Sequence, residues 1–241
     1  MPQDNDNLPD RKNQTNKQVD AFLQRVAKTP AINRTEGTRG RLIFAMDATA
    51  SRQPAWDRAA AIQGQMFHET AQLGGLDIQL AFYRGFGEFK ISKWTHEEAD
   101  MQRWMSAVQC HAGETQIGKV ISHTVNETKR STVNALIFVG DCCEEDIDQI
   151  GKRAGELGVL GVPAFMFQEG NDPIAQFAFK EVARLTRGAC CSFDTSSASS
   201  LRDLLAAVAV YAAGGRKALL RMANSKGGET LRLAHQITAK D

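Results

Sequence analysis

The sequence predicts a doubly wound α/β fold, with a mostly parallel sheet, one antiparallel edge strand and helices on both faces. Short runs that are apolar throughout, of which 42–46 is the first, alternate with amphipathic segments of helical length. Such runs are typical of strands buried on both faces, and the segments between them suit right-handed crossovers between parallel strands. The exception is 88–93, which follows a tight turn at 84–87 and is expected to pair antiparallel at the sheet edge.

The first half of the predicted domain opens with the buried strand 42–46. Pro54 suits the first turn of the next helix, which keeps an apolar face to Leu73 and ends at the Gly74–Gly75 pair. Apolar residues then alternate along 77–83, which indicates the second strand, ahead of the edge strand. One face of the helix after the edge strand carries Met101, Trp104, Met105 and Val108.

The second half continues the alternation of helix and strand. A helix begins near Thr115 with apolar residues at helical spacing. The elements expected after it are a strand at 133–139, a helix at 144–157, a strand at 162–167, a helix at 177–186, a strand at 190–193 and a helix at 201–211. We therefore expect one domain over 40–213. It follows a polar extension, 1–39, with a short helix at 19–27, and it precedes a basic tail, 214–241.

The composition is that of an ordinary globular protein. Of its 241 residues, 42% are hydrophobic and 24% charged, which argues against wholesale disorder. The 29 Lys and Arg nearly balance the 28 Asp and Glu, so the charge does not favour a nucleic-acid partner. No apolar run reaches the roughly 18 residues of a membrane span. The polar N-terminus does not resemble a secretory signal, so we expect a cytoplasmic protein whose basic tail is either solvated or bound to an anionic partner.

The five cysteines are expected to be reduced, buried and inert. One stands alone at Cys110, and the others form two adjacent pairs, Cys142–Cys143 and Cys190–Cys191. Neighbouring residues of a strand point to opposite faces, so neither pair is suited to bridge to itself. The pairs of cysteines two residues apart that are typical of zinc sites are absent from the sequence.

Polar side chains gather where predicted strands end. Asp47, Thr49 and Ser51 follow the first strand, Thr115 opens a helix, and Asp141 follows the strand at 133–139. In a doubly wound sheet, ligands bind beyond the carboxyl ends of the strands, so these side chains are expected at one edge. Carboxylate and hydroxyl oxygens suit a hard divalent cation, above all Mg²⁺.

This pattern resembles the metal-ion-dependent adhesion site of von Willebrand factor type A (VWA) domains, over about 40–213. The family pattern is Asp-x-Ser-x-Ser, with Thr at some hydroxyl positions, then a distant Thr and a later Asp after a buried strand. The resemblance implies a VWA, Rossmann-like fold in which Asp47, Thr49, Ser51, Thr115 and Asp141 hold the metal, the aspartates directly or through water. The sequence departs from the pattern at Thr49, where Ser is commoner, and at Gly140-Asp141-Cys142, where Thr-Asp-Gly is often found.

The resemblance implies an adaptor function inside the cell rather than catalysis. We expect a protein-binding domain that depends on Mg²⁺ or Mn²⁺, and a protein partner that offers an Asp or Glu to the metal. Four residues near the predicted edge would form the rim that selects this partner: Arg52, Arg84, Phe86 and His111.

Other interpretations of the same residues remain. The cation could serve a metal-dependent hydrolase, the VWA fold could be a metal-free scaffold, or the polar residues could be helix caps. A phosphatase of the haloacid dehalogenase type would need a second Asp where the chain has Thr49. A dinucleotide site would need Gly-x-Gly-x-x-Gly after the first strand, and 47–53 holds no glycine.

Overall fold

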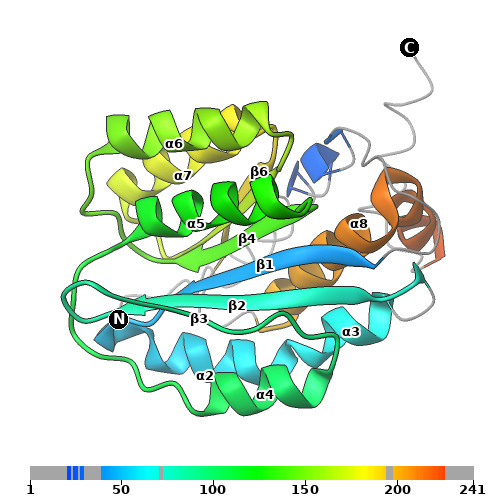
Figure 1. Ribbon diagram of the computed structural model, residues 1–241, viewed down its shortest axis with the longest axis horizontal. Coiled ribbons are helices and arrows are strands. Elements are labelled where there is room, and N and C mark those ends of the chain that lie inside the picture. The colour runs from blue at the N-terminus through cyan, green and yellow to red at the C-terminus, as the bar shows by residue number, and fades with distance from the viewer. Residues whose placement is uncertain are drawn as a thin grey trace, which may run out of the picture.

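The chain folds around one six-stranded sheet in a computed structural model that describes residues 21–22, 24–26, 28–29, 39–70, 73–193 and 198–225. Its strands are β1 (Gly40–Asp47), β2 (Leu76–Arg84), β3 (Glu88–Ile91), β4 (Ala135–Gly140), β5 (Ala164–Glu169) and β6 (Ala189–Phe193). Their order is β3-β2-β1-β4-β5-β6 (Figure 1). β3 pairs antiparallel with β2, and every other pair of neighbours is parallel. The predicted doubly wound fold with an antiparallel edge strand is confirmed.

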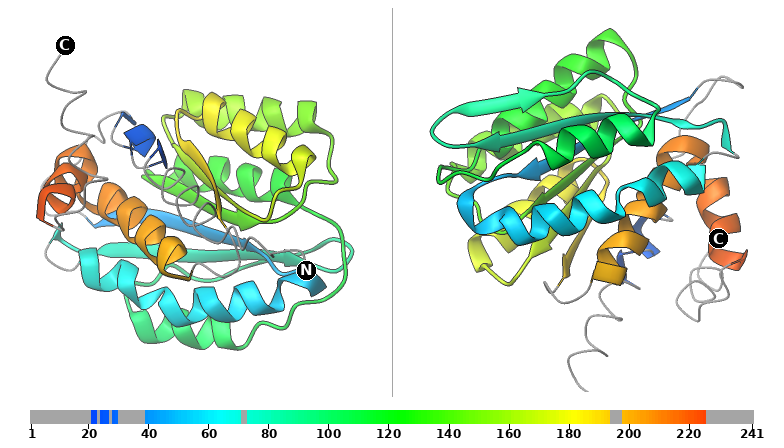
Figure 2. Two further views of the ribbon diagram at one scale, coloured as in Figure 1. Left: turned by 180° about the vertical axis from the view of Figure 1, so that it is seen from behind. Right: turned by 90° about the horizontal axis from the view of Figure 1, so that it is seen from below.

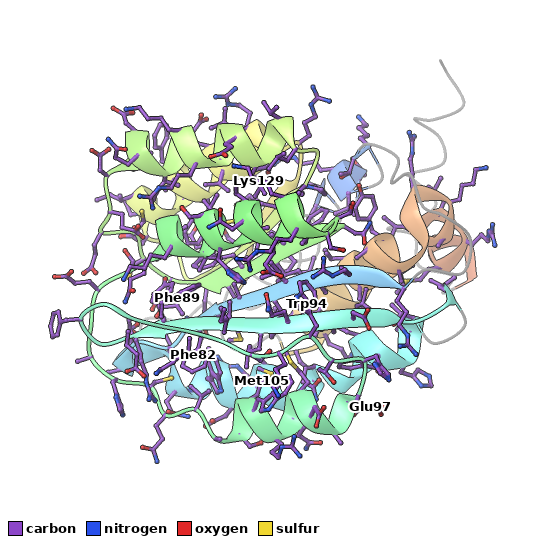
Figure 3. The ribbon with its side chains drawn as sticks, viewed as in Figure 1. Phe82, Phe89, Trp94, Glu97, Met105 and Lys129 are labelled. Atoms are coloured by element: carbon purple, nitrogen blue, oxygen red, sulfur yellow. The ribbon has the colours of Figure 1, made fainter. Side chains whose placement is uncertain are left out.

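Helices cover both faces of the sheet. One face carries α2 (Gln53–Ile62), α3 (Gly64–Thr70), α4 (Glu98–Ser106) and α8 (Ala198–Ser225), and the other carries α5 (Ile117–Arg130), α6 (Ile147–Val159) and α7 (Pro173–Leu185). Seen from behind and from below, α8 lies on the same side of the sheet as α2 and α3 (Figure 2). Phe82 and Met105 lie on the side of the sheet that carries α2 and α4, opposite Lys129 (Figure 3).

Alternate side chains of the buried strands build the two cores. In β1, Leu42, Phe44 and Met46 belong to the core under α2, α4 and α8. Ile43 and Ala45 belong to the core under α5, α6 and α7. Because successive strand residues point to opposite faces, a strand that is apolar at every position can serve both cores.

The prediction of one long helix from Pro54 to Leu73 is wrong, because the structure has two helices there, α2 and α3. A Cβ at Gly64, the first residue of α3, would lie 2.1 Å from Glu98 Oε1 of α4. α4 therefore approaches the start of α3 through an exposed side chain, a tertiary contact that helical periodicity does not reveal. A 3-10 turn, Ala50–Arg52, forms part of the loop between β1 and α2.

Segments at both ends of the chain add to the core under α8. Residues 21–22 and 24–26 are helical, and the Phe22 ring lies 5.1 Å from that of Phe167 in β5. α8 runs past its expected end at 211 to Ser225, with non-helical backbone at Gly215 (φ 69°). The chain before residue 21, the linker 30–38 and the tail beyond 225 lie outside the described residues. No helix in the described part of the chain is long and apolar enough to cross a membrane.

Candidate metal site

The candidate site lies at the carboxyl edge of the sheet, where β1 and its neighbour β4 end. Asp47 is the last residue of β1, and Asp141 directly follows β4. Met46 is paired with Val139 in the parallel register, so the two aspartates leave adjacent strands at nearly the same level. A carboxylate oxygen of each, together with the sulfur of Cys142, lies within 4.8 Å of the others. The predicted convergence of Asp47 and Asp141 is therefore present in the structure.

Both aspartates keep one buried oxygen without a hydrogen-bond partner. Asp47 is fully buried, and its Oδ1 accepts the backbone N–H of Thr49 at 2.7 Å. Asp141 Oδ2 accepts the Ser51 hydroxyl at 3.3 Å. No described residue donates to Asp47 Oδ2 or to Asp141 Oδ1. Buried polar atoms are normally paired, so an unpaired oxygen on each of two neighbouring carboxylates fits a bound cation.

The Asp47 carboxyl is electrostatically unfavourable as it stands. Burial raises its pKa above the ordinary value, and the nearby Asp141 charge raises the pKa further. The hydrogen bonds from Thr49 and the Arg52 charge act in the opposite direction without cancelling the effect of burial. A divalent cation would compensate the desolvated charge and so favour its ionised form.

Thr115 is placed by the loop after β4 rather than by contact with the aspartates. Its hydroxyl accepts the Glu144 backbone N–H at 3.0 Å, and Glu144 Oε2 accepts the Thr115 N–H at 3.2 Å. The adjacent Glu145 accepts the backbone N–H groups of Ile117 and Gly118 at the start of α5. These bonds hold the Thr115 segment against the Asp141 loop, as a cap satisfies the free N–H groups of a helix start.

Arg52 was expected on the rim, but it lies inside the protein. Its side chain is 2% exposed, hydrogen-bonds to Glu169 and has Nη1 3.7 Å from Asp141 Oδ2. Arg58 Nη2 binds the other Glu169 oxygen at 2.7 Å. The buried guanidinium of Arg52 therefore lies beside the aspartates, and Glu169, the last residue of β5, neutralises its charge. Sequence reasoning missed Glu169, although its place at the end of an apolar strand is a usable signal.

The other rim residues lie around the same edge. Phe86, in the turn between β2 and β3, is 82% exposed, and His111 is also exposed, while its backbone N–H donates to Ala48 O at 3.0 Å. Arg84 is held by Glu88 at 3.0 Å and donates to Gln109 O at 2.6 Å. Phe86 and His111 are thus available to an approaching molecule, whereas Arg84 is engaged within the protein.

Two further residues near the aspartates were not anticipated as site residues. Burial, followed by the charges of Asp141 and Asp47, raises the pKa of the Cys142 thiol to about 12. Tyr83 is fully buried beside Asp47 in the sheet, and no described residue hydrogen-bonds its hydroxyl. Burial raises the Tyr83 pKa well above its usual value. Cys142 could have been found from its place next to Asp141, whereas Tyr83 becomes relevant only once the strands are paired.

Comparisons with known proteins identify the fold. No protein-family model and no curated protein sequence matches the chain. The crystal structure of the SpRpn10 VWA domain is similar with a TM-score of 0.55 at 12% identity, over 74% of this chain and 98% of that one. The vWF domain of the type V pili tip protein Mfa5 from Porphyromonas gingivalis gives 0.53 at 10%, over 71% and 96%.

A third similar structure is the pilus adhesin SpaC from Lactobacillus rhamnosus GG, with a TM-score of 0.53 at 10% identity, over 80% of this chain and 31% of that one. At such low identities the likeness establishes the fold alone. The strand order, the antiparallel edge strand and these alignments agree with one another. The chain therefore has the fold of a VWA domain.

Proposed function

We propose that the chain is a protein-interaction domain that binds its partner through a divalent cation, Mg²⁺ or Mn²⁺. The observation that carries the proposal is the pair of buried carboxylate oxygens, Asp47 Oδ2 and Asp141 Oδ1, that no described residue satisfies. Unpaired buried carboxylates are costly, and a cation is the simplest partner that removes the cost for both.

The residues around these oxygens are suited to a hard cation. Thr49 and Ser51 follow Asp47 in the same loop, and Ser51 is already in contact with Asp141. Together with Thr115 they would supply neutral hydroxyl oxygens, which leave much of the positive charge on the cation. An Asp or Glu of a partner protein is the ligand that such a charge attracts, with Phe86 and His111 exposed beside it.

A binding role is more consistent with this edge than catalysis. The Ser51 hydroxyl donates to Asp141 and not to a histidine that could act as its base. The nearby His111 is exposed to solvent, and its backbone N–H donates to Ala48 O. One of the similar structures is itself described as a pilus adhesin. We also propose a reducing compartment such as the cytoplasm, with which five free cysteines are consistent.

Arg52 favours one other candidate, a metal-free scaffold with the same fold. Its buried guanidinium lies 3.7 Å from Asp141 and offers that carboxylate a permanent positive charge. It does not reach every oxygen, since Asp141 Oδ1 stays unpaired. Metal dependence therefore distinguishes the two candidates.

The test is partner capture from a lysate with the full chain in Mg²⁺, in EDTA, and with Asp141→Ala in Mg²⁺. Asp148→Ala is the matched control, because Asp148 is an exposed carboxylate in the first turn of α6. We expect partners that are lost with EDTA and with Asp141→Ala but kept with Asp148→Ala. The same partners under all four conditions would support the metal-free scaffold instead.

A further inference from the structure

We propose that Cys142 is a ligand of this site and that the site prefers a borderline divalent cation of the Zn²⁺ class to Mg²⁺. The inference rests on the proposed metal site and replaces the Mg²⁺ or Mn²⁺ and the hydroxyl ligands named there with a softer ion held through sulfur. Asp47, Asp141 and Cys142 each offer one ligand atom, and these three atoms all lie within 4.8 Å of one another. The spacing of cysteines along the sequence gave no such indication, because two of the three ligands are carboxylates.

The geometry requires little movement to close around an ion. Atoms within 4.8 Å of one another can all lie within about 2.8 Å of a common point, compared with Zn–S and Zn–O bonds of about 2.3 and 2.0–2.2 Å. Asp47 is fully buried at the end of β1 and carries an unpaired Oδ2, which is an independent sign of a missing partner. Asp141 also carries an unpaired oxygen, and it leaves the adjacent strand.

The donor set determines which ion is preferred. A sulfur ligand favours zinc-like ions, whereas Mg²⁺ selects oxygen alone. On binding, the S–H bond of Cys142 breaks, a sulfur–metal bond forms and the proton passes to solvent, with no change of oxidation state. Two carboxylates and a thiolate fill three positions, and zinc sites of this kind keep a fourth for an external ligand. The partner carboxylate of the proposed function fits that position.

The adjacent cysteine provides a matched control. Cys143 is 6% exposed, belongs to the core under α6 and α7, and has its Sγ 3.9 Å from the Glu145 carbonyl oxygen. It lies next to Cys142 in the chain but is not a member of the candidate ligand group. Replacing either cysteine removes one thiol, and only Cys142 is expected to affect the metal.

The experiment uses Co²⁺ as a spectroscopic substitute for Zn²⁺ in the reduced full chain. A thiolate ligand gives Co²⁺ a sulfur-to-metal charge-transfer band in the near ultraviolet. We expect this band in the native chain and in Cys143→Ala, and its loss in Cys142→Ser and Cys142→Ala. By calorimetry, Zn²⁺ should bind at least about tenfold more tightly than Mg²⁺, and Cys142→Ser should remove most of that difference while Mg²⁺ affinity changes less.

Each other result has a definite meaning once circular dichroism shows that the variants are folded. Mg²⁺ binding without a thiolate band, or a band that persists in both Cys142 variants, would overturn the ligand assignment and leave the proposed function standing. Binding of none of the three ions would overturn both proposals.

Discussion

Two buried carboxylates at opposite ends of the sheet have very different sets of hydrogen-bond donors. Glu127 of α5 lies near the start of β1 and accepts hydrogen bonds from Trp94 Nε1 at 2.9 Å, Arg41 at 3.4 Å and Arg130 at 3.1 Å. Asp47, at the end of β1, receives a hydrogen bond on one oxygen only. The two carboxylates therefore differ in their donors.

The pKa values reflect this difference. Burial alone would raise the pKa of Glu127, but the Trp94 hydrogen bond and the charges of His123 and Arg41 outweigh burial and lower it. Burial dominates at Asp47 and raises its pKa. The Glu127 cluster thus stabilises the fold, whereas the Asp47 site retains a cost that a ligand can relieve, as functional sites often do.

The largest effect we expect is stabilisation by metal at the Asp47 end alone. At a free metal concentration about one hundred times Kd, binding should add about 2.7 kcal/mol to the free energy of unfolding. Thermal melts with increasing Mg²⁺, Mn²⁺ or Zn²⁺ should show the rise for the native chain and for Glu127→Ala, but not for Asp47→Asn. A rise that survives Asp47→Asn would place the ion elsewhere.

Removal of Glu127 should be the next largest change. Glu127→Ala leaves the Trp94 N–H and the Arg41 guanidinium without their carboxylate, which we expect to cost about 2 kcal/mol at neutral pH, with or without metal. Urea unfolding measures the loss. Because the Glu127 pKa is lowered by folding, its stabilisation is present above the unfolded pKa and is lost as the pH falls through the folded value.

An exposed ion pair serves as the control for Glu127. Glu156 contacts Lys129 at 2.6 Å, but both side chains are half exposed. Glu156→Ala should change stability by less than about 0.5 kcal/mol. Equal losses for Glu156→Ala and Glu127→Ala would mean that burial and multiple donors give Glu127 no special role.

Asp47→Asn should stabilise the metal-free chain, whereas Glu127→Ala destabilises it. The amide removes a buried charge and its repulsion with Asp141, so the metal-free chain should gain about 1 kcal/mol at neutral pH. Because folding raises the Asp47 pKa, stability should be highest at pH values below the pKa of Asp47 in the unfolded chain and should fall as the pH rises through its pKa in the folded chain. Asp47→Asn should flatten this dependence of stability on pH. A clear loss of stability would instead support a capping role through the Thr49 N–H.

The fold was more accessible from the sequence than the details of the site. Residues 42–46 of β1 and 135–139 of β4 are apolar at every position, a pattern set by burial on both faces, so these strands could be located from sequence alone. The break before Gly64 could not, because apolar residues continue at helical spacing across it. Local periodicity reports the face that an element buries and not what approaches the element from elsewhere.

The same distinction applies to the site residues. Asp47 and Asp141 could be brought together by the rule that parallel strands end at one edge. Arg52 and Glu169 are 117 residues apart in sequence, and only their pairing places the arginine inside rather than on the rim. The approach of the Cys142 sulfur to both aspartates likewise depends on the loop conformation after β4.

The smallest effect on stability is expected at Ser51. Its hydroxyl makes one 3.3 Å hydrogen bond to Asp141 Oδ2, at a distance beyond the usual optimum and in an exposed setting. Ser51→Ala should therefore change metal-free stability by less than about 0.5 kcal/mol, since water can replace the hydroxyl. Trp94→Phe is the counterpart at the other end, because it removes one donor to Glu127 at 2.9 Å and should cost about 1 kcal/mol. Urea unfolding of both variants in EDTA compares them, and a larger loss for Ser51→Ala would show that the Asp141 end is held by its hydrogen bonds rather than left open for a cation.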